Sequence, residues 1–230
     1  QSGGYFQDTF YPDNVLNFYP GDAIQSKTAN RLYDLVFSHP AFRQMYLRRL
    51  RTLMDTLLKA TGTPTNALNV EPRMRALADL MDPPGVATSD ADLDNAKWGP
   101  TWGNTTLSIL RNEVERTIST YLPARRAFLA SAAANVNGET IPSAQPTNAV
   151  VAIASWDYNP AGGNQDQEYI ELRNANAYAV DVSGWKLGGG VSFNLKPGTV
   201  IPAGTSLYVS PNVKAFRARA TGPRGGQSLL

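Results

Sequence analysis

The sequence predicts an α+β protein in two parts, a mainly α-helical N-terminal subdomain followed by an antiparallel β-sandwich or barrel. Apolar residues before Asn135 repeat at three- and four-residue steps, which is the period of an amphipathic helix. After Asn135, β-branched residues alternate with Gly, Pro and Asn turns. A stretch of turn-forming residues separates the two patterns. We therefore place the helical subdomain at 1–134, a linker at 135–147 and the β part at 148–230.

The strongest helical pattern runs from Phe42 to Leu57 and ends near Gly62. One face is apolar, and the other carries four arginines. We interpret the arginine face as solvated rather than phosphate-binding, because the first 147 residues contain equal numbers of acidic and basic side chains. Further helices are predicted at 72–84, 89–99 and 106–122, and from Pro123 onwards. The four arginines are Arg43, Arg48, Arg49 and Arg51.

Seven short strands are expected in the β part, at 149–155, 168–174, 178–182, 185–187, 191–195, 199–201 and 206–210. The glycine run at 187–191 is expected to form a hairpin turn, since no helical pattern follows it. An immunoglobulin-type sandwich takes about 100 residues, so we expect this one to be truncated before its last strands. The expected core residues are Val151, Ile153, Ile170, Leu172, Val180, Val182, Trp185, Leu187, Phe193, Leu207 and Val209. Of these, Trp185 is expected to contribute more stability than any neighbouring acid.

Four acids between Gln165 and Leu187 could form either a catalytic carboxylate cluster or the solvent side of a sheet. Strand alternation favours the second interpretation, because Ile170 and Leu172 share one face and make it the core face. The opposite face then carries Tyr169, Glu171 and Arg173. We predict these three as partner-binding residues, with Glu171 in solvent beside Arg173 and with no catalytic role for the acids.

The other three acids are assigned by the same alternation. Asp166 falls in the loop before the strand, and Asp181 lies between Val180 and Val182, so it is expected to point outward. Glu168 shares the parity of the core residues at the start of its strand. We expect Glu168 to accept backbone hydrogen bonds.

Composition excludes several kinds of chemistry. The chain has no cysteine, so disulfides, thiolate catalysis and cysteine-ligated metals are ruled out. The single His39 cannot build a metal site alone, and no Gly-x-Ser-x-Gly elbow accompanies it. The acids at 90, 92 and 94 lack the later residues of a calcium loop, and capping explains them better. We predict no catalytic, cofactor-binding or metal-binding residue in this chain.

Charge and hydropathy narrow the class of partner. The net charge is +2, which does not indicate nucleic acid or an anionic membrane, although Arg217, Arg219 and Arg224 form a weak basic group. No apolar run approaches the roughly 18 residues of a membrane-spanning helix. No motif indicates a small-molecule ligand.

The β part resembles the lamin-tail domain. The resemblance rests on EYIELRN at 168–174, DVSGWKL at 181–187 and PGTVIPAGTSL at 197–207, which occur in the order that the family shows. It implies an immunoglobulin-like sandwich without catalytic residues, usually a binding module. The partner that this resemblance implies is a protein or a cell-surface component. In bacterial proteins such domains are commonly fused to secreted or surface-associated enzymes.

The helical part resembles the C-terminal part of the CotH kinase-like family, at 30–58, 94–99 and 125–129. That family is similar to protein kinases, and its nucleotide- and metal-binding segments lie before the resembled part. Residues 1–26 do not match them, since FQDTF at 6–10 lacks the tryptophan and the second acid. Without those ligands the chain should not transfer phosphate.

Together these patterns predict a fragment of a larger bacterial protein, located outside the cell or in the cell envelope. The leading hypothesis is a non-catalytic lamin-tail binding module attached to the scaffold end of a kinase-like domain. One alternative is part of an atypical protein kinase whose ATP and Mg²⁺ site lies upstream, so that ATP and Mg²⁺ would belong to the parent protein. A second alternative is a DNA-binding module, which predicts salt-sensitive binding.

Overall fold

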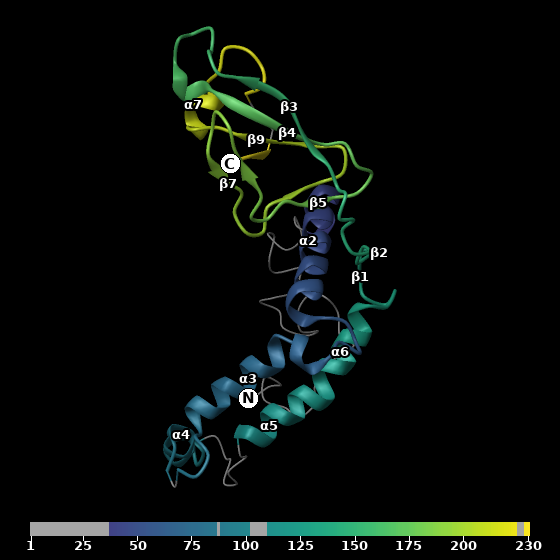
Figure 1. Ribbon diagram of the computed structural model, residues 1–230, viewed down its shortest axis with the longest axis vertical. Helices are drawn as coiled ribbons and strands as arrows, with labels where there is room; N and C mark the ends of the chain where they lie inside the picture. Colours follow the sequence, from purple (N-terminus) through teal and green to yellow (C-terminus); the bar gives the residue numbers. More distant parts are fainter. Residues whose placement is uncertain (1–36, 87, 102–109, 225–227) are drawn as a thin grey trace. The chain divides into compact units, whose positions relative to one another are not determined.

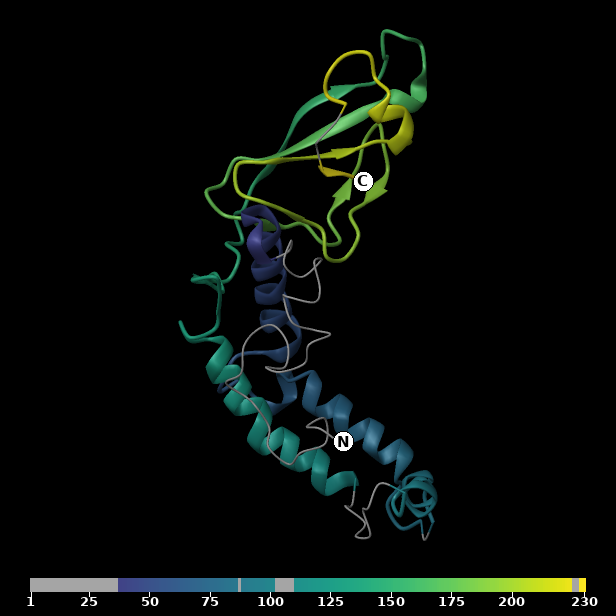
Figure 2. The same ribbon diagram turned by 180° about the vertical axis from the view of Figure 1, so that it is seen from behind.

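A computed structural model describes residues 37–86, 88–101, 110–224 and 228–230 (Figures 1 and 2). The described chain divides into two compact units. The helical unit comprises Leu53–Ile141, and the β unit comprises residues 37–52 together with Pro142–Leu230. The aromatic segment at 1–26, the helix start near residue 28 and the start of the helix predicted from 106 lie outside the described residues.

Helices α3 and α5 run side by side in the helical unit (Figures 1 and 2). A continuous helical run passes from α5 through the π-helical turn η3 into α6. Pro123 lies in the first turn of α6, directly after η3. Proline has no backbone N–H and cannot make the i→i−4 hydrogen bond of an α-helix. The π turn before it has a different hydrogen-bond spacing, and the helical run continues through Pro123. The bounds are η1 Met54–Leu58, η2 Thr65–Ala67, α3 Val70–Met81, α4 Asp90–Trp98, α5 Leu110–Arg116, η3 Thr117–Tyr121 and α6 Leu122–Leu129.

A small hairpin follows α6, formed by β1 (Asn135–Val136) and β2 (Glu139–Thr140). Its two-residue turn has positive φ at Asn137 (51°) and Gly138 (81°). An Asn-Gly pair is the preferred sequence for such a turn, because both residues tolerate the left-handed region. Part of the stretch predicted as a linker is therefore ordered.

The β unit contains a four-stranded sheet in the order β10-β9-β4-β3. The central pairs are antiparallel, whereas β10 is parallel to β9. Two smaller antiparallel pairs, β5-β8 and β6-β7, supply the second layer. The bounds are β3 Val151–Asp157, β4 Tyr169–Asn174, β5 Val180–Asp181, β6 Lys186–Leu187, β7 Phe193–Asn194, β8 Val200–Ile201, β9 Ser206–Val209 and β10 Ser228–Leu229.

This architecture confirms the predicted fold class, with helices followed by antiparallel strands in small sheets of immunoglobulin-like type. The glycine run does form a hairpin, because β6 and β7 pair across it with Leu187 opposite Phe193. Three elements of the described residues extend the β unit beyond the predicted strands. They are the 3-10 turn η4 (Gln165–Gln167), the short helix α7 (Val213–Arg217) and strand β10. Helix α2 (Pro40–Leu53) belongs almost entirely to the same unit.

The core of the β unit lies between the four-stranded sheet and the smaller strand pairs. Its buried residues are Leu172, Val180, Val182, Leu195, Ile201, Leu207 and Val209. Val151, Ile170, Leu187 and Phe193 are half-buried and pack against this core, as predicted. Asn174 is fully buried at the end of β4, and its amide donates hydrogen bonds to the carbonyl oxygens of Tyr178, Ile201 and Pro202.

Two predicted core residues are exposed, Ile153 by 54% and Trp185 by 39%. Ile153 has the inner parity but lies on β3, which is the edge strand of its sheet. Trp185 follows a turn closed by a hydrogen bond from its N–H to the carbonyl oxygen of Val182. Gly184 in that turn has φ of 73°. The turn interrupts the alternation on which the core assignment of Trp185 depended, so that assignment is wrong.

Candidate functional site

The three predicted partner-binding residues lie on one face of the four-stranded sheet, which we call the outer face. Register places Glu171 between Ser155 on β3 and Tyr208 on β9. Arg173 lies between Ala152 and Ser206 in the same way. Strands β3, β4 and β9 run side by side in Figures 1 and 2. We define the outer face by Ser155, Tyr169, Glu171, Arg173, Ser206 and Tyr208.

The carboxylate of Glu171 is held by its cross-strand neighbours rather than by solvent. Ser155 Oγ donates to Oε2 at 2.6 Å, and Ser206 Oγ donates to Oε1 at 2.5 Å. These two hydrogen bonds lower the pKa of Glu171 below its ordinary value, and Tyr208 and Arg173 add smaller effects in the same direction. The prediction that Glu171 points to solvent beside Arg173 is therefore only half right, because the face is correct but the principal partners are serines.

Aromatic packing covers one end of the outer face. The Tyr169 ring lies 5.7 Å from the Tyr208 ring and 5.9 Å from the ring of Phe216, which is fully buried on α7. Arg219 lies over the same Tyr169 ring at 4.8 Å. Tyr169 is consequently half-buried, whereas Arg173 at the other end is exposed.

Arg219 is the buried member of the weak basic group seen in the sequence. It is 5% exposed, and its guanidinium donates to the carbonyl oxygen of Gln167 and to Asp157 Oδ2 at 2.8 Å. Its charge therefore ties the end of β3 to the loop before β4. A guanidinium held in this way does not present itself to a phosphate backbone.

Replacing Glu171 with glutamine is expected to lower the free energy of unfolding by about 1 kcal/mol at pH 7, because two charge-assisted hydrogen bonds on a partly exposed group become neutral ones. The lowered pKa of Glu171 means that this stability is present above the pKa of the unfolded chain and is lost as the pH falls through the folded value. Urea unfolding followed from pH 7 to pH 3 measures it. A wild-type-minus-variant difference that does not shrink toward pH 3 would contradict the assignment.

Asp181 has the outward orientation predicted for it, but the expectation that it faces solvent is wrong. The residue is 6% exposed. Its Oδ1 accepts hydrogen bonds from the Ser183 amide, at 2.9 Å, and from the Ser183 hydroxyl, while Oδ2 pairs with Arg49 Nη1 at 3.1 Å. Gln145 bonds both the N–H and the C=O of Asp181. Strand alternation is correct locally, but helix α2 covers the outward side of β5.

The arginine face of α2 is a packing surface, not a solvated one. Arg48 is 3% exposed, donates to the carbonyl oxygen of Ser143 at 2.8 Å and lies 5.9 Å from the centre of the Tyr178 ring. Arg49 reaches Asp181 and the Ser183 hydroxyl. Figure 1 shows α2 beside β5, consistent with these contacts. The prediction of a solvated face fails because the charge balance of the whole segment conceals which arginines meet an acid far along the chain.

Asp92 and His39, two of the residues considered for metal binding and catalysis, have structural partners. Asp92 forms a capping box with Ser89 at the start of α4, with Ser89 N and Oγ both donating to Oδ2 at 3.0 Å. His39 precedes α2, and its ring stacks on Phe42 at 4.8 Å. Within the ranges that the structure describes, no group of three or more His, Cys, Asp or Glu residues could hold a metal ion. No described helix has the length and apolarity to cross a membrane.

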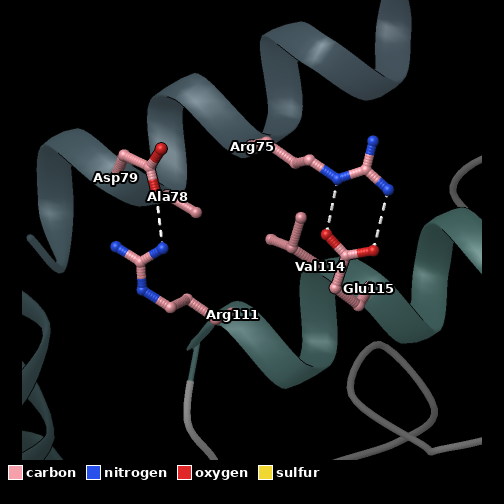
Figure 3. Close-up of a pocket in the computed structure, with 6 residues that line it drawn as sticks. All are labelled: Arg75, Ala78, Asp79, Arg111, Val114 and Glu115. Carbon is pink, nitrogen blue, oxygen red and sulfur yellow. Dashed lines mark hydrogen bonds and ion pairs between the residues drawn. The ribbon is translucent and has the colours of Figure 1, made fainter. Parts of the chain in front are cut away.

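A shallow pocket of about 210 Å³ lies between α3 and α5 in the helical unit (Figure 3). Arg75 forms a two-pronged pair with Glu115, at 2.6 and 2.8 Å, and Arg111 pairs with Asp79. Ala78 and Val114 lie between the two pairs. Since both arginines already bind carboxylates, the pocket offers no unneutralised charge to a ligand. The geometry fits a seam that joins two helices.

Comparison with known families gives a match in the β part. Residues 144–227 match the Lamin Tail Domain family model. No curated protein and no solved structure matches the chain. The lamin tail domain is a non-enzymatic family with an immunoglobulin-like fold, which fits the strand layers described above and a non-catalytic role for this region. The EYIELRN stretch contributes β4, and the DVSGWKL stretch holds Asp181 and the turn before β6.

Proposed function

We propose that this chain provides a lamin-tail module that binds a protein or a cell-surface component, attached to the scaffold end of a CotH kinase-like domain in an exported bacterial protein. The observation that carries the proposal is the lamin-tail match over 144–227, a region in which Asp157, Glu171 and Asp181 have structural partners. The CotH part rests on the sequence resemblance of the helices alone.

The outer face supplies the polar part of the proposed binding surface. Ser155 and Ser206 hold the carboxylate of Glu171 in one place. Because this side chain is already ordered, it loses little conformational entropy when a partner binds it. Arg173 is exposed, and its guanidinium lies 3.4 Å from Ser206 Oγ. Exposed arginines are enriched at binding surfaces because they pair with carboxylates in two-pronged geometry. Tyr169, packed under Phe216 and Arg219, stiffens the end of this surface.

A nucleotide-binding test distinguishes the proposal from the kinase alternative. We expect no rise in the melting temperature of this chain with ATP and Mg²⁺, because the described residues provide no phosphate cradle or metal cluster. A ligand present at 100 times the Kd of its site would stabilise the unit that holds the site by about 2.7 kcal/mol, which for a unit of this size raises the melting temperature by roughly 10 to 20 °C. Differential scanning fluorimetry, with Mg²⁺ alone as the control, measures this. A rise of that size with ATP would overturn the non-catalytic assignment and favour the kinase one.

A further inference from the structure

We propose that the outer edge of β3, which pairs with no strand among the residues that the structure describes, accepts an extended peptide from a partner protein as an added antiparallel strand. The peptide would present apolar side chains to Ile153 and Trp156 on the inner side and a carboxylate to Arg173 on the outer side. Strand addition would be the way in which the proposed binding module holds its partner, so this inference rests on the proposed function. Strand addition of this kind obtains affinity from backbone hydrogen bonds and specificity from alternate side chains.

The backbone of β3 is suited to receive a strand. In the sheet order β10-β9-β4-β3, strand β3 pairs with β4 on one side and forms the sheet edge on the other. Its seven residues, VAIASWD, contain no proline and no lysine, the residues that commonly protect an edge. At about every second residue, its N–H and C=O groups point away from β4. Such groups form a template for another strand.

Two exposed apolar side chains on the inner side of β3 are the main evidence for an added strand. Ile153 pairs with Leu172, and Trp156 pairs with Ile170, so both have the parity of the core. The bulge between Ile153 and Ser155 inserts one residue, and this keeps Trp156 on the same side as Ile153. Yet Ile153 is 54% exposed and Trp156 is 62% exposed. A neighbouring strand would bury both side chains and extend the core that already contains Leu172.

The outer side defines the charge of the partner. Arg173 stands on β4 opposite Ala152, a small residue at the edge. Strands lie about 4.8 Å apart, so the long side chain of Arg173 can reach over Ala152 to the strand beyond it. The carboxylate of Glu171 is held by Ser155 and Ser206. An acidic residue on the added strand would complement the exposed guanidinium.

A second copy of the chain fits this edge less well than a foreign peptide. The outward-parity residues of β3 are Ala152, Ser155 and Asp157, and Asp157 is paired with Arg219 at 2.8 Å. A symmetric β3–β3 pair would therefore bring no unpaired carboxylate to Arg173. It would also place a bulge in both strands of the new pair, which interrupts the ladder twice. The carboxylate must come from a different sequence.

Selection from a random library of peptides of about ten residues, displayed on phage and applied to the full chain, tests the proposal. We expect enriched peptides that alternate apolar residues and carry an acid on the polar side. Arg173→Glu should weaken the binding of a selected peptide about tenfold, which is about 1.4 kcal/mol. Replacing its acid by lysine should restore binding to that variant. Trp156→Lys should abolish binding, whereas Val213→Thr, at an exposed position on α7, should not change it.

Methylation of alternate peptide nitrogens separates strand addition from binding by side chains alone. We expect loss of binding when the methylated nitrogens are those that donate to β3, and little change for the other set. No enrichment, or equal binding of the two methylated peptides, overturns the proposal. Self-association of the full chain in sedimentation, lost in Trp156→Lys, would assign the edge to a second copy instead. The thermal-shift test with ATP and Mg²⁺ does not depend on peptide binding, so failure of strand addition and failure of the proposed function can be told apart.

Discussion

Replacement of Arg126 by methionine is expected to destabilise the helical unit by about 3 to 5 kcal/mol, the cost of removing one partner from a buried ion pair. Arg126 is 8% exposed and Glu71 is 2% exposed, and the two side chains form an ion pair. The guanidinium of Arg126 also donates to the carbonyl oxygen of Leu58 at 2.6 and 2.9 Å. The substitution leaves a buried carboxylate without its cation and removes the donors that bind the partly buried carbonyl group of Leu58.

The position of Arg126 explains why one side chain has so large an effect. The helical turn η1 ends at Leu58, and the last carbonyl groups of a helix have no partner within it. Lys59 follows with φ of 64°, so the chain turns away there. Arg126 on α6 therefore caps the end of η1 and neutralises Glu71 at the start of α3. Three segments of the helical unit meet at one guanidinium.

Chemical denaturation followed by circular dichroism measures the effect, and hydrogen exchange of α3 and α6 localises it. The matched control is Arg125→Met, since Arg125 is half-buried and its guanidinium lies over the Phe128 ring at 5.2 Å. We expect that change to cost about 1 kcal/mol or less. The double variant Glu71→Leu with Arg126→Met should recover part of the loss. An equal cost for Arg125→Met and Arg126→Met would show that the buried pair has no special role.

Replacement of Asp181 by asparagine is expected to cost the β unit about 2 kcal/mol at pH 7, because the buried carboxylate loses its charge-assisted hydrogen bonds and the half-buried guanidinium of Arg49 loses its counter-charge. Burial by itself raises the pKa of Asp181. Hydrogen bonds from Ser183, Thr52 and Arg49 outweigh burial, and the pKa is lowered overall. A lowered folded pKa means that the ionised carboxylate stabilises the fold above the pKa of the unfolded chain, about 3.9. This stability is lost as the pH falls through the lower, folded value.

Urea unfolding at pH 7 and at a series of lower pH values measures this contribution. The difference between wild type and Asp181→Asn should decrease once the pH is below about 4. Asp166→Asn is the control, since Asp166 is exposed and its carboxylate contacts Asn212 at 3.3 Å. A double-mutant cycle with Arg49→Gln should show coupling of about 1 kcal/mol or more. Additive effects of the two substitutions would refute the role of the pair in holding α2.

Local patterns in the sequence were sufficient for much of the fold. The three- and four-residue repeat predicted the helix from Phe42 to Leu57, and α2 with η1 covers it. Alternation in EYIELRN placed Leu172 in the core and Glu171 with Arg173 on the other face. These predictions succeed because backbone geometry repeats every 3.6 residues in a helix and every two in a strand. The turn chemistry of the glycine run is equally local.

Alternation did not predict the exposure of Asp181, Trp185 and Ile153. Asp181 has the outward parity predicted for it, yet a helix from more than a hundred residues earlier covers it. Trp185 lies after a turn that resets the alternation. Ile153 has the inward parity but no described strand beyond it. Strand alternation predicts to which side of a sheet a residue points. The tertiary structure decides whether another helix or strand covers that side.

The sequence by itself determined the division into helices and strands, the outer and inner faces of β4 and the motifs that match the lamin tail domain. The tertiary structure decided which charges are buried. Arg48, Arg49 and Arg126 look like ordinary surface cations in the sequence, but each meets an acceptor between 2.6 and 3.1 Å away that is 68 to 132 residues distant along the chain. Periodicity describes the backbone of one segment, whereas the partner of a charge depends on how the chain folds back.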